Sequence, residues 1–144
     1  MISMSYEFLE HKADVKFRAR GSTLEEMFVF SAEALWETIR GDIKILEQES
    51  RNLEIEGKDI MGLLHNFLEE FLFLLDAEDF LVSRIEGVKI EAPSDDGLFR
   101  LSAIVFGDSA NNYKFTNDVK AITYSEMFVR EEDNEFFCQV VLDV

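Results

Sequence analysis

One segment constrains the fold more than any other: the run from Ile60 to about Leu75, which has the periodicity of a helix. Its apolar residues cover more than a narrow stripe: Met61, Leu63, Leu64, Phe67, Leu68, Phe71, Leu72 and Leu75. A helix that is apolar over so much of its surface needs cover on two sides. We therefore predict a helix, capped by Asp59, inside one compact domain that spans residues 1–144.

A second helix is predicted to begin after Ser22 and Thr23, each of which is followed three residues later by a Glu. This spacing is the capping-box signature of a helix N-terminus. Gly41 ends the helix near Arg40. Its predicted buried stripe consists of Leu24, Met27, Phe28, Leu35 and Ile39.

The remaining apolar segments are predicted to be strands. The clearest is Val15–Arg20, in which apolar and basic residues alternate, so that Lys16, Arg18 and Arg20 share the solvent face. The other predicted strands are Tyr6–Leu9, Leu53–Ile55, Phe80–Val82, Val88–Ala92, Leu98–Phe106, Lys120–Arg130 and Glu135–Asp143. Strands and helices are segregated, which predicts an α+β fold with two helices on a largely antiparallel sheet. A helix followed by strands occurs twice, which favours a two-fold plan.

The chain is strongly acidic, with 30 Asp and Glu against 14 Lys and Arg and a net charge of -16. Such a field repels RNA, but it suits a metal cation or a basic protein partner. The plainer interpretation is that the acidity keeps the domain soluble. A single cysteine, the absence of a leader at the start and acids that interrupt every apolar stretch predict a cytoplasmic protein with no membrane partner.

Three acids and one histidine are candidate ligands or contacts. His11 and Asp14 flank the start of the Val15–Arg20 strand, and Asp143 follows a nearly continuous apolar run. If the first and last strands lie side by side, these carboxylates meet, and Asp42 can complete an oxygen-rich site for Ca²⁺, Mg²⁺ or Mn²⁺. The ordinary alternatives are turn capping for His11 and Asp14 and a solvated position for Asp143.

No catalytic constellation stands out in the sequence. Phosphate-binding loops and nucleophile-elbow motifs are absent. Cys138 lies in an apolar run, where a thiol is usually an inert core residue, and His65 has no cue for catalysis. We therefore predict no catalytic residue and no independent enzyme activity.

Blocks of sequence in conserved order resemble the archease family. They are Tyr6-Glu-Phe-Leu-Glu-His-Lys-Ala-Asp-Val15, Gly21-Ser-Thr-Leu-Glu-Glu-Met-Phe28, Leu63-Leu-His-Asn-Phe-Leu-Glu-Glu-Phe71, Val119-Lys-Ala-Ile-Thr-Tyr124 and Val140-Val-Leu-Asp-Val144. The resemblance spans nearly the whole chain. It departs from the family pattern at Lys12, where Thr is usual, and at Ser125, where many members have His.

The resemblance implies two interleaved strand-helix-strand-strand units. It also implies a metal-binding cofactor, with calcium among the candidate ions, that activates the tRNA-splicing RNA ligase by promoting guanylylation and multiple turnover. RNA is then contacted only through the ligase. By the same resemblance, Asp14 and Asp143 hold the divalent cation with Asp42 as a less secure third ligand, while Lys120 and His11 contact the partner.

Two other functions remain open at the level of sequence. A general chaperone or adaptor would use the acidic surface and aromatic groups to hold partners without a cation. A metal-dependent hydrolase would need a nucleophile-generating site, and the acids have no imidazole set beyond His11.

Overall fold

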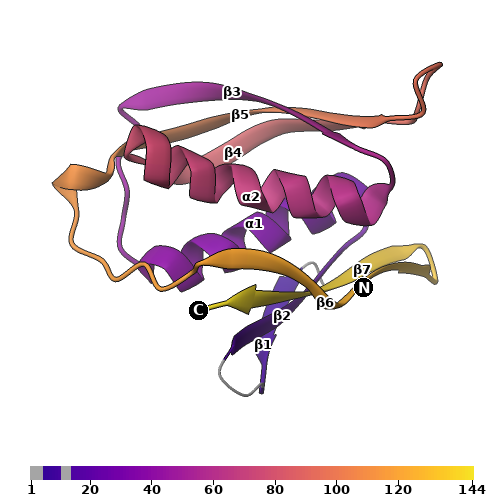
Figure 1. The fold of residues 1–144 in the computed structure, drawn as a ribbon, viewed down its shortest axis with the longest axis horizontal. Coiled ribbons are helices and arrows are strands. Elements are labelled where there is room, and N and C mark those ends of the chain that lie inside the picture. Colours follow the sequence, from indigo (N-terminus) through magenta and orange to yellow (C-terminus); the bar gives the residue numbers. More distant parts are fainter. Residues whose placement is uncertain (1–4, 11–13) are drawn as a thin grey trace.

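The computed structural model describes residues 5–10 and 14–144 and shows three layers, with both helices between two antiparallel sheets (Figure 1). Along the chain the elements are β1 Ser5–Leu9, β2 Asp14–Gly21, α1 Leu24–Arg40, β3 Glu49–Gly57, α2 Ile60–Glu78, β4 Phe80–Glu91, β5 Phe99–Ser109, a 3₁₀ turn Ala110–Asn112, β6 Ala121–Glu132 and β7 Glu135–Asp143. One sheet, sheet A, has the order β1-β2-β7-β6, and the other, sheet B, has the order β3-β5-β4. The prediction of an α+β fold with antiparallel strands is confirmed, and the strands divide into two sheets.

The two-fold plan is visible in the topology. The unit β3-α2-β4-β5 is contiguous and pairs its strands in the order first, third, second. The strands of β2-α1-β6-β7 pair in that same order, and the first unit is inserted between α1 and β6. The two units are therefore interleaved, as the sequence resemblance implies.

Each unit turns from its first strand into its helix in the same way. A Cβ at Gly21 would lie 2.7 Å from the Glu26 Cβ, and one at Gly57 would lie 2.5 Å from the Leu63 nitrogen. A side chain at either position would collide with the first turn of the following helix. The cap follows two residues later: Thr23 accepts from the Glu26 N–H (3.1 Å), and Asp59 accepts from the Gly62 N–H (2.7 Å).

Both helices contact strands of both sheets, so each is covered on two sides. The prediction for α2 is confirmed, since Leu63, Leu64, Phe67 and Leu68 are all fully buried. In α1, Phe28 packs on Phe67 with ring centroids 5.5 Å apart. Burial of each such side chain contributes roughly 1.5–3 kcal/mol, so the helices form the centre of one continuous core.

Two predicted strands are joined into one in the structure. The segment Phe80–Val82 and, apart from Ala92, the segment Val88–Ala92 are parts of one strand, β4. Its pairing with β5 shifts register between Glu86 and Lys89, and Gly87 has a positive φ of 67°. A bulge of this kind interrupts alternation without ending the strand, which explains why the sequence pattern separates the two segments.

Candidate functional site

Asp14 and Asp143 lie directly opposite each other on adjacent antiparallel strands. Asp14 is the first residue of β2, Asp143 is the last residue of β7, and they are Cα partners in the ladder. Side chains directly opposite in such a pair are on the same face of the sheet and close together. On its other side Asp143 is paired with Ala121 of β6, which has a small, uncharged side chain. We call the pair Asp14 and Asp143 the acidic row.

The acidic row lies on the outer face of sheet A, away from the helices. Its inward neighbours Val140 and Leu142 are fully buried, whereas Asp143 is exposed. Figure 1 shows the C-terminal strand passing beside β2 below the helix layer. Asp14 is partly buried and Asp143 is open to solvent, so an approaching cation or partner can reach the row.

Lys120 is held next to the acidic row by the backbone. Its N–H donates to the Asp143 carbonyl with an N–O distance of 2.7 Å, and the residue is exposed. The hydrogen bond ties the segment before β6 to the end of β7. Among the predicted site residues, Asp14, Asp143 and Lys120 therefore come together, although they are far apart in sequence.

The basic residues of β2 continue the same outer face, as predicted. Lys16 Nζ lies 3.2 Å from Glu126 Oε1, and Arg18 Nε donates to Gln139 Oε1 at 2.9 Å. Gln139, itself buried, donates to the carbonyl of Glu126 (2.7 Å), which has a positive φ of 55° at the irregularity in β6. These contacts fix β2, β7 and β6 to one another, and thereby the strand ends that carry the acidic row.

Asp42 has a different environment. It follows Gly41, the C-cap of α1, and lines a hollow together with Glu33 and Trp36 of that helix. Over residues 5–10 and 14–144, no three His, Cys, Asp or Glu side chains form a group suited to a metal ion, so Asp42 does not join the acidic row in such a set. His11 lies outside the described residues.

The acidic row fits a hard divalent cation as part of a ligand set. Two adjacent carboxylates supply the oxygen ligands that Ca²⁺, Mg²⁺ and Mn²⁺ prefer. Like charges directly opposite each other also disfavour the strand pairing, and a bound cation would offset that cost. Because such ions take six or more ligands, water, backbone oxygens or partner groups have to complete the shell.

The contact between His65 of α2 and strand β6 was not predicted from the sequence. The His65 and Tyr124 rings are stacked with centroids 4.2 Å apart, and His65 Nε2 lies 2.9 Å from the Ile122 carbonyl oxygen. This links α2 to β6, the strand whose start is next to Asp143. No local pattern signals it, because helix and strand are brought together only by the fold.

Cys138 is fully buried, as expected for a core thiol. Burial raises its pKa to about 11, and Ser31 Oγ lies 3.1 Å from its sulfur. A thiol held in its neutral form is a poor nucleophile. The structure thus gives this residue a packing role.

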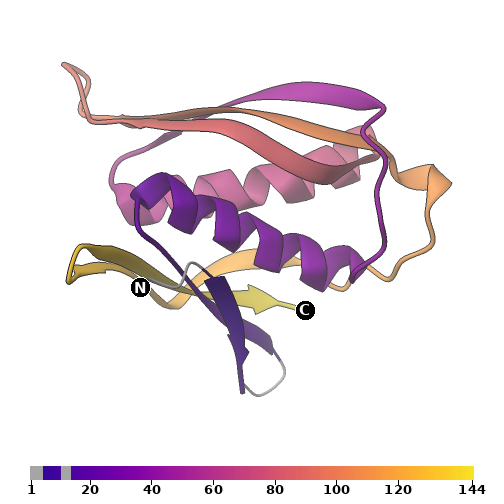
Figure 2. The ribbon, with the colours of Figure 1, turned by 180° about the vertical axis from the view of Figure 1, so that it is seen from behind.

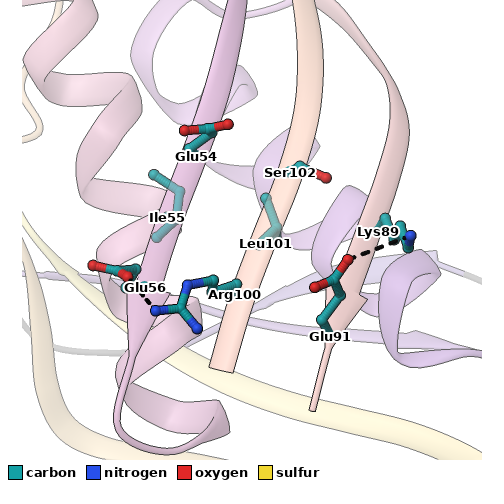
Figure 3. Close-up of a pocket in the computed structure, with 8 residues that line it drawn as sticks. All are labelled: Glu54, Ile55, Glu56, Lys89, Glu91, Arg100, Leu101 and Ser102. Atoms are coloured by element: carbon teal, nitrogen blue, oxygen red, sulfur yellow. Dashed lines mark ion pairs between the residues drawn. The ribbon is translucent and has the colours of Figure 1, made fainter. Parts of the chain in front are cut away.

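A hollow of about 490 Å³ on the outer face of sheet B also carries charged side chains (Figure 3). Here the cationic groups are paired: Arg100 lies 3.0 Å from Glu56, and Lys89 lies 3.3 Å from Glu91. Arg100 is also paired with Asp96 and holds the pKa of that carboxyl below its usual range. Each cationic group of this hollow therefore has a carboxylate partner, within a strand for Lys89 and across strands and in the turn before β5 for Arg100.

No helix in the described part of the chain is both long enough and apolar enough to cross a membrane.

Comparison with known proteins identifies the family. The model of the archease protein family matches residues 6–144, and the chain belongs to this family. It is 39% identical to the protein archease of Pyrobaculum neutrophilum over 142 residues, covering 96% of this chain and 95% of the relative. It is also 39% identical to the protein archease of Pyrococcus abyssi, covering 96% and 98%.

Solved structures agree with the fold. The solution structure of protein 1598 from Methanobacterium thermoautotrophicum matches with a TM-score of 0.82 and 33% identity, covering 97% of this chain and 99% of that one. A crystal structure of an archease from Thermotoga maritima, described as a possible chaperone, matches with a TM-score of 0.61. At 15% identity, with 94% of each chain covered, the second match supports the fold alone.

Proposed function

We propose that this protein is a metal-binding activator of an RNA ligase of the tRNA-splicing type, and that it does not join RNA itself. The observation that carries the proposal is the acidic row, in which Asp14 stands opposite Asp143 on the outer face of sheet A. Membership of the archease family supports it. The net charge of -16 favours a cation and a basic protein surface over direct RNA binding.

The residues of the row have distinct roles in this proposal. Asp14 and Asp143 hold a divalent cation, which supplies positive charge to the phosphate oxygens of a nucleotide entering the ligase. Lys120 presents its ammonium group beside them and contacts the ligase or its nucleotide. The ladder between β2 and β7 keeps the two carboxylates in place before the partner arrives, so little ordering is required on binding.

The proposal is tested by guanylylation of the matching RNA ligase, measured at substoichiometric activator in a defined divalent cation. We expect strong stimulation that Asp14→Asn reduces by about 100-fold, since even loss of a residue that only supports a metal ligand costs roughly 10–100-fold. Unchanged stimulation by Asp14→Asn contradicts the mechanism.

Asp42→Asn serves as the comparison variant in the same assay. Because Asp42 lines the hollow beside α1, we expect it to retain the dependence of stimulation on cation concentration. A shift of that dependence to higher cation concentration, similar to the shift in Asp14→Asn, would restore Asp42 to the ligand set.

A chaperone or adaptor is the second candidate, favoured by the exposed aromatic side chains Phe8 and Phe73 and by the description of the Thermotoga maritima relative as a possible chaperone. It predicts that the protein suppresses aggregation of unrelated proteins in the presence of a chelator. Suppression that persists in Asp14→Asn, without any stimulation of the ligase, would favour this candidate.

A further inference from the structure

Two neighbouring residues of α2, His65 and Asn66, reach strands of different sheets. His65 Nε2 lies 2.9 Å from the Ile122 carbonyl oxygen of β6, and Asn66 Nδ2 donates to the Glu56 carbonyl of β3 (2.8 Å). Both strands lie at the edge of their sheet. Figure 1 shows α2 with β3 above it and β6 below it, and in Figure 2, seen from behind, α1 stands in front of α2. Helix α2 therefore ties one edge strand of each sheet to the helix layer.

The start of β6 is joined to sheet A over a short distance. Its ladder with β7 covers residues 121–123, and the register is then irregular between Thr123 and Phe128. The Thr123 hydroxyl adds a bond to the Val141 carbonyl of β7 (2.9 Å). A short segment at a sheet edge opens locally more easily than a central strand, because few backbone hydrogen bonds hold it. The bond from His65 to Ile122 is an attachment to α2 that does not depend on the ladder.

This segment carries Lys120 to the acidic row. Lys120 directly precedes β6, its N–H donates to the Asp143 carbonyl (2.7 Å), and the residue is exposed. It is two residues from the carbonyl that His65 binds, so a displacement of Ile122 moves the backbone from which Lys120 projects. The carboxylates of Asp14 and Asp143 are less affected, because the ladder between β2 and β7 holds them.

His65 is itself held in place. Its ring stacks on the Tyr124 ring with centroids 4.2 Å apart and an interplanar angle of 9°, and its side chain is 13% exposed. Glu69 Oε2 lies 3.8 Å from Nε2, beyond hydrogen-bond distance, so the Ile122 carbonyl is the acceptor. A carbonyl oxygen can only accept, so Nε2 carries the proton of this bond.

We propose that His65 is a positioning residue for Lys120: its Nε2–H holds the start of β6 so that Lys120 stands beside Asp143. His65 itself contacts neither the cation nor the partner. The inference rests on the proposed function, in which Lys120 contacts the ligase or its nucleotide. Loss of the bond displaces Lys120 and leaves the two carboxylates in place.

Three variants of α2 test this role. His65→Leu removes the donor and keeps an apolar side chain against Tyr124. His65→Gln keeps an amide N–H at the same number of bonds from the backbone as Nε2, so it should restore the attachment. The matched control is Asn66→Leu, because Asn66 is the next residue on the helix and its bond goes to sheet B.

The first measurement is amide hydrogen exchange of Lys120, followed by NMR in the full chain without ligase. We expect exchange to be about fivefold faster in His65→Leu, the factor that corresponds to loss of one ordinary hydrogen bond. In His65→Gln and Asn66→Leu it should stay within about twofold of the parent. Unchanged exchange in His65→Leu, or equal acceleration in Asn66→Leu, would overturn the proposal.

The second measurement is stimulation of ligase guanylylation in a double-mutant cycle with Lys120→Met. We expect His65→Leu to lower stimulation by about fivefold, and the double variant to be no lower than Lys120→Met alone, because His65 acts through Lys120. The cation concentration that gives half-maximal stimulation should stay within about twofold of the parent in His65→Leu. Losses that multiply in the double variant would show independent effects and overturn the positioning role.

The positioning role and the proposed function fail separately. If Lys120→Met and Asp14→Asn stimulate the ligase as the parent does, the proposed function is wrong, and the exchange rate of Lys120 still decides whether His65 holds this segment. If Lys120→Met loses stimulation while His65→Leu keeps it, the proposed function stands and the positioning role is wrong.

Discussion

One cross-strand row on the outer face of each sheet carries charges, and the two rows arrange them in opposite ways. Across sheet B, one row reads Glu56, Arg100, Glu91, so unlike charges alternate from strand to strand. Across sheet A, the row at the end of β2 and β7 places Asp14 opposite Asp143. Unlike cross-strand pairs contribute roughly 0.2–1 kcal/mol, whereas like charges directly opposite are destabilising.

The contrast is between a row in which unlike charges face each other across strands and a row in which like charges do. On sheet B each guanidinium or ammonium group in the hollow has a carboxylate within ion-pair distance, and the arrangement needs no ligand. On sheet A the acidic row sets two carboxylates opposite each other, an arrangement that is unfavourable by itself. Residues that are unfavourable for folding and lie at an accessible edge are candidates for function.

The largest expected effect comes from exchanging one acid of each row for its amide. Asp143→Asn is expected to reduce stimulation of ligase guanylylation by about 100-fold, as for loss of a metal ligand. Glu91→Gln, the matched change on sheet B, is expected to leave it unchanged. Initial rates of guanylylation at fixed cation concentration provide the measurement. Equal loss in both variants would mean that overall negative charge, rather than the acidic row, activates the ligase.

Thermal unfolding with and without a divalent cation gives the next largest effect. A cation at one hundred times its dissociation constant is expected to stabilise the protein by about 2.7 kcal/mol, because it binds only the folded state. The shift is expected to disappear in Asp14→Asn and to persist in Glu56→Gln. A cation-dependent shift that survives in Asp14→Asn would place the cation elsewhere.

Removing ion pairs from the outer face of sheet B is expected to have a smaller effect on the melting temperature. Arg100→Met removes exposed ion pairs, which contribute little, so we expect a drop in melting temperature of about 2 °C or less. Arg100 lowers the pKa of Asp96 in the folded state. This stabilisation is therefore present above the ordinary Asp pKa and is lost as the pH falls through the lowered value. The melting temperatures of the parent and of Arg100→Met should therefore differ at neutral pH and should converge at strongly acidic pH.

The smallest effect is expected in the absence of cation. Asp143→Asn removes the like-charge pair, so the chelated protein should gain a few tenths of a kcal/mol in unfolding free energy. Urea denaturation in the presence of a chelator measures this gain, and added salt should diminish it. A clear loss of stability would show that Asp143 makes a favourable contact in the free protein.

The sequence predicted the parts of the fold that depend on local patterns. Thr23 and Asp59 cap the two helices as expected, because the capping signal lies within one turn of the helix start. The alternation in Val15–Arg20 placed Phe17 in the core and Lys16 on the solvent face. The meeting of Asp14 and Asp143 was anticipated from the family resemblance and from the tendency of first and last strands to pair. In the structure the second strand, β2, and not β1, pairs with the last strand, and the two residues are partners in that ladder.

Features that depend on contacts distant in sequence were not predicted. The division of the strands into two sheets cannot be read from alternation, which specifies a buried face but not a partner. The hollow that contains Asp42 arises because β1 and β4 approach α1, and none of these segments signals the others.

The interleaved units have a consequence for how the chain reaches its folded state. The unit β3-α2-β4-β5 is contiguous and can assemble as soon as it has left the ribosome, whereas β2 and α1 wait for β6 and β7. During that interval Phe17 and Ala19 lack the strand that completes their sheet, and the exposed edge of β2 is open to pairing with other chains. Sheet A therefore depends on late, long-range closure, and the acidic row forms only in chains that complete it.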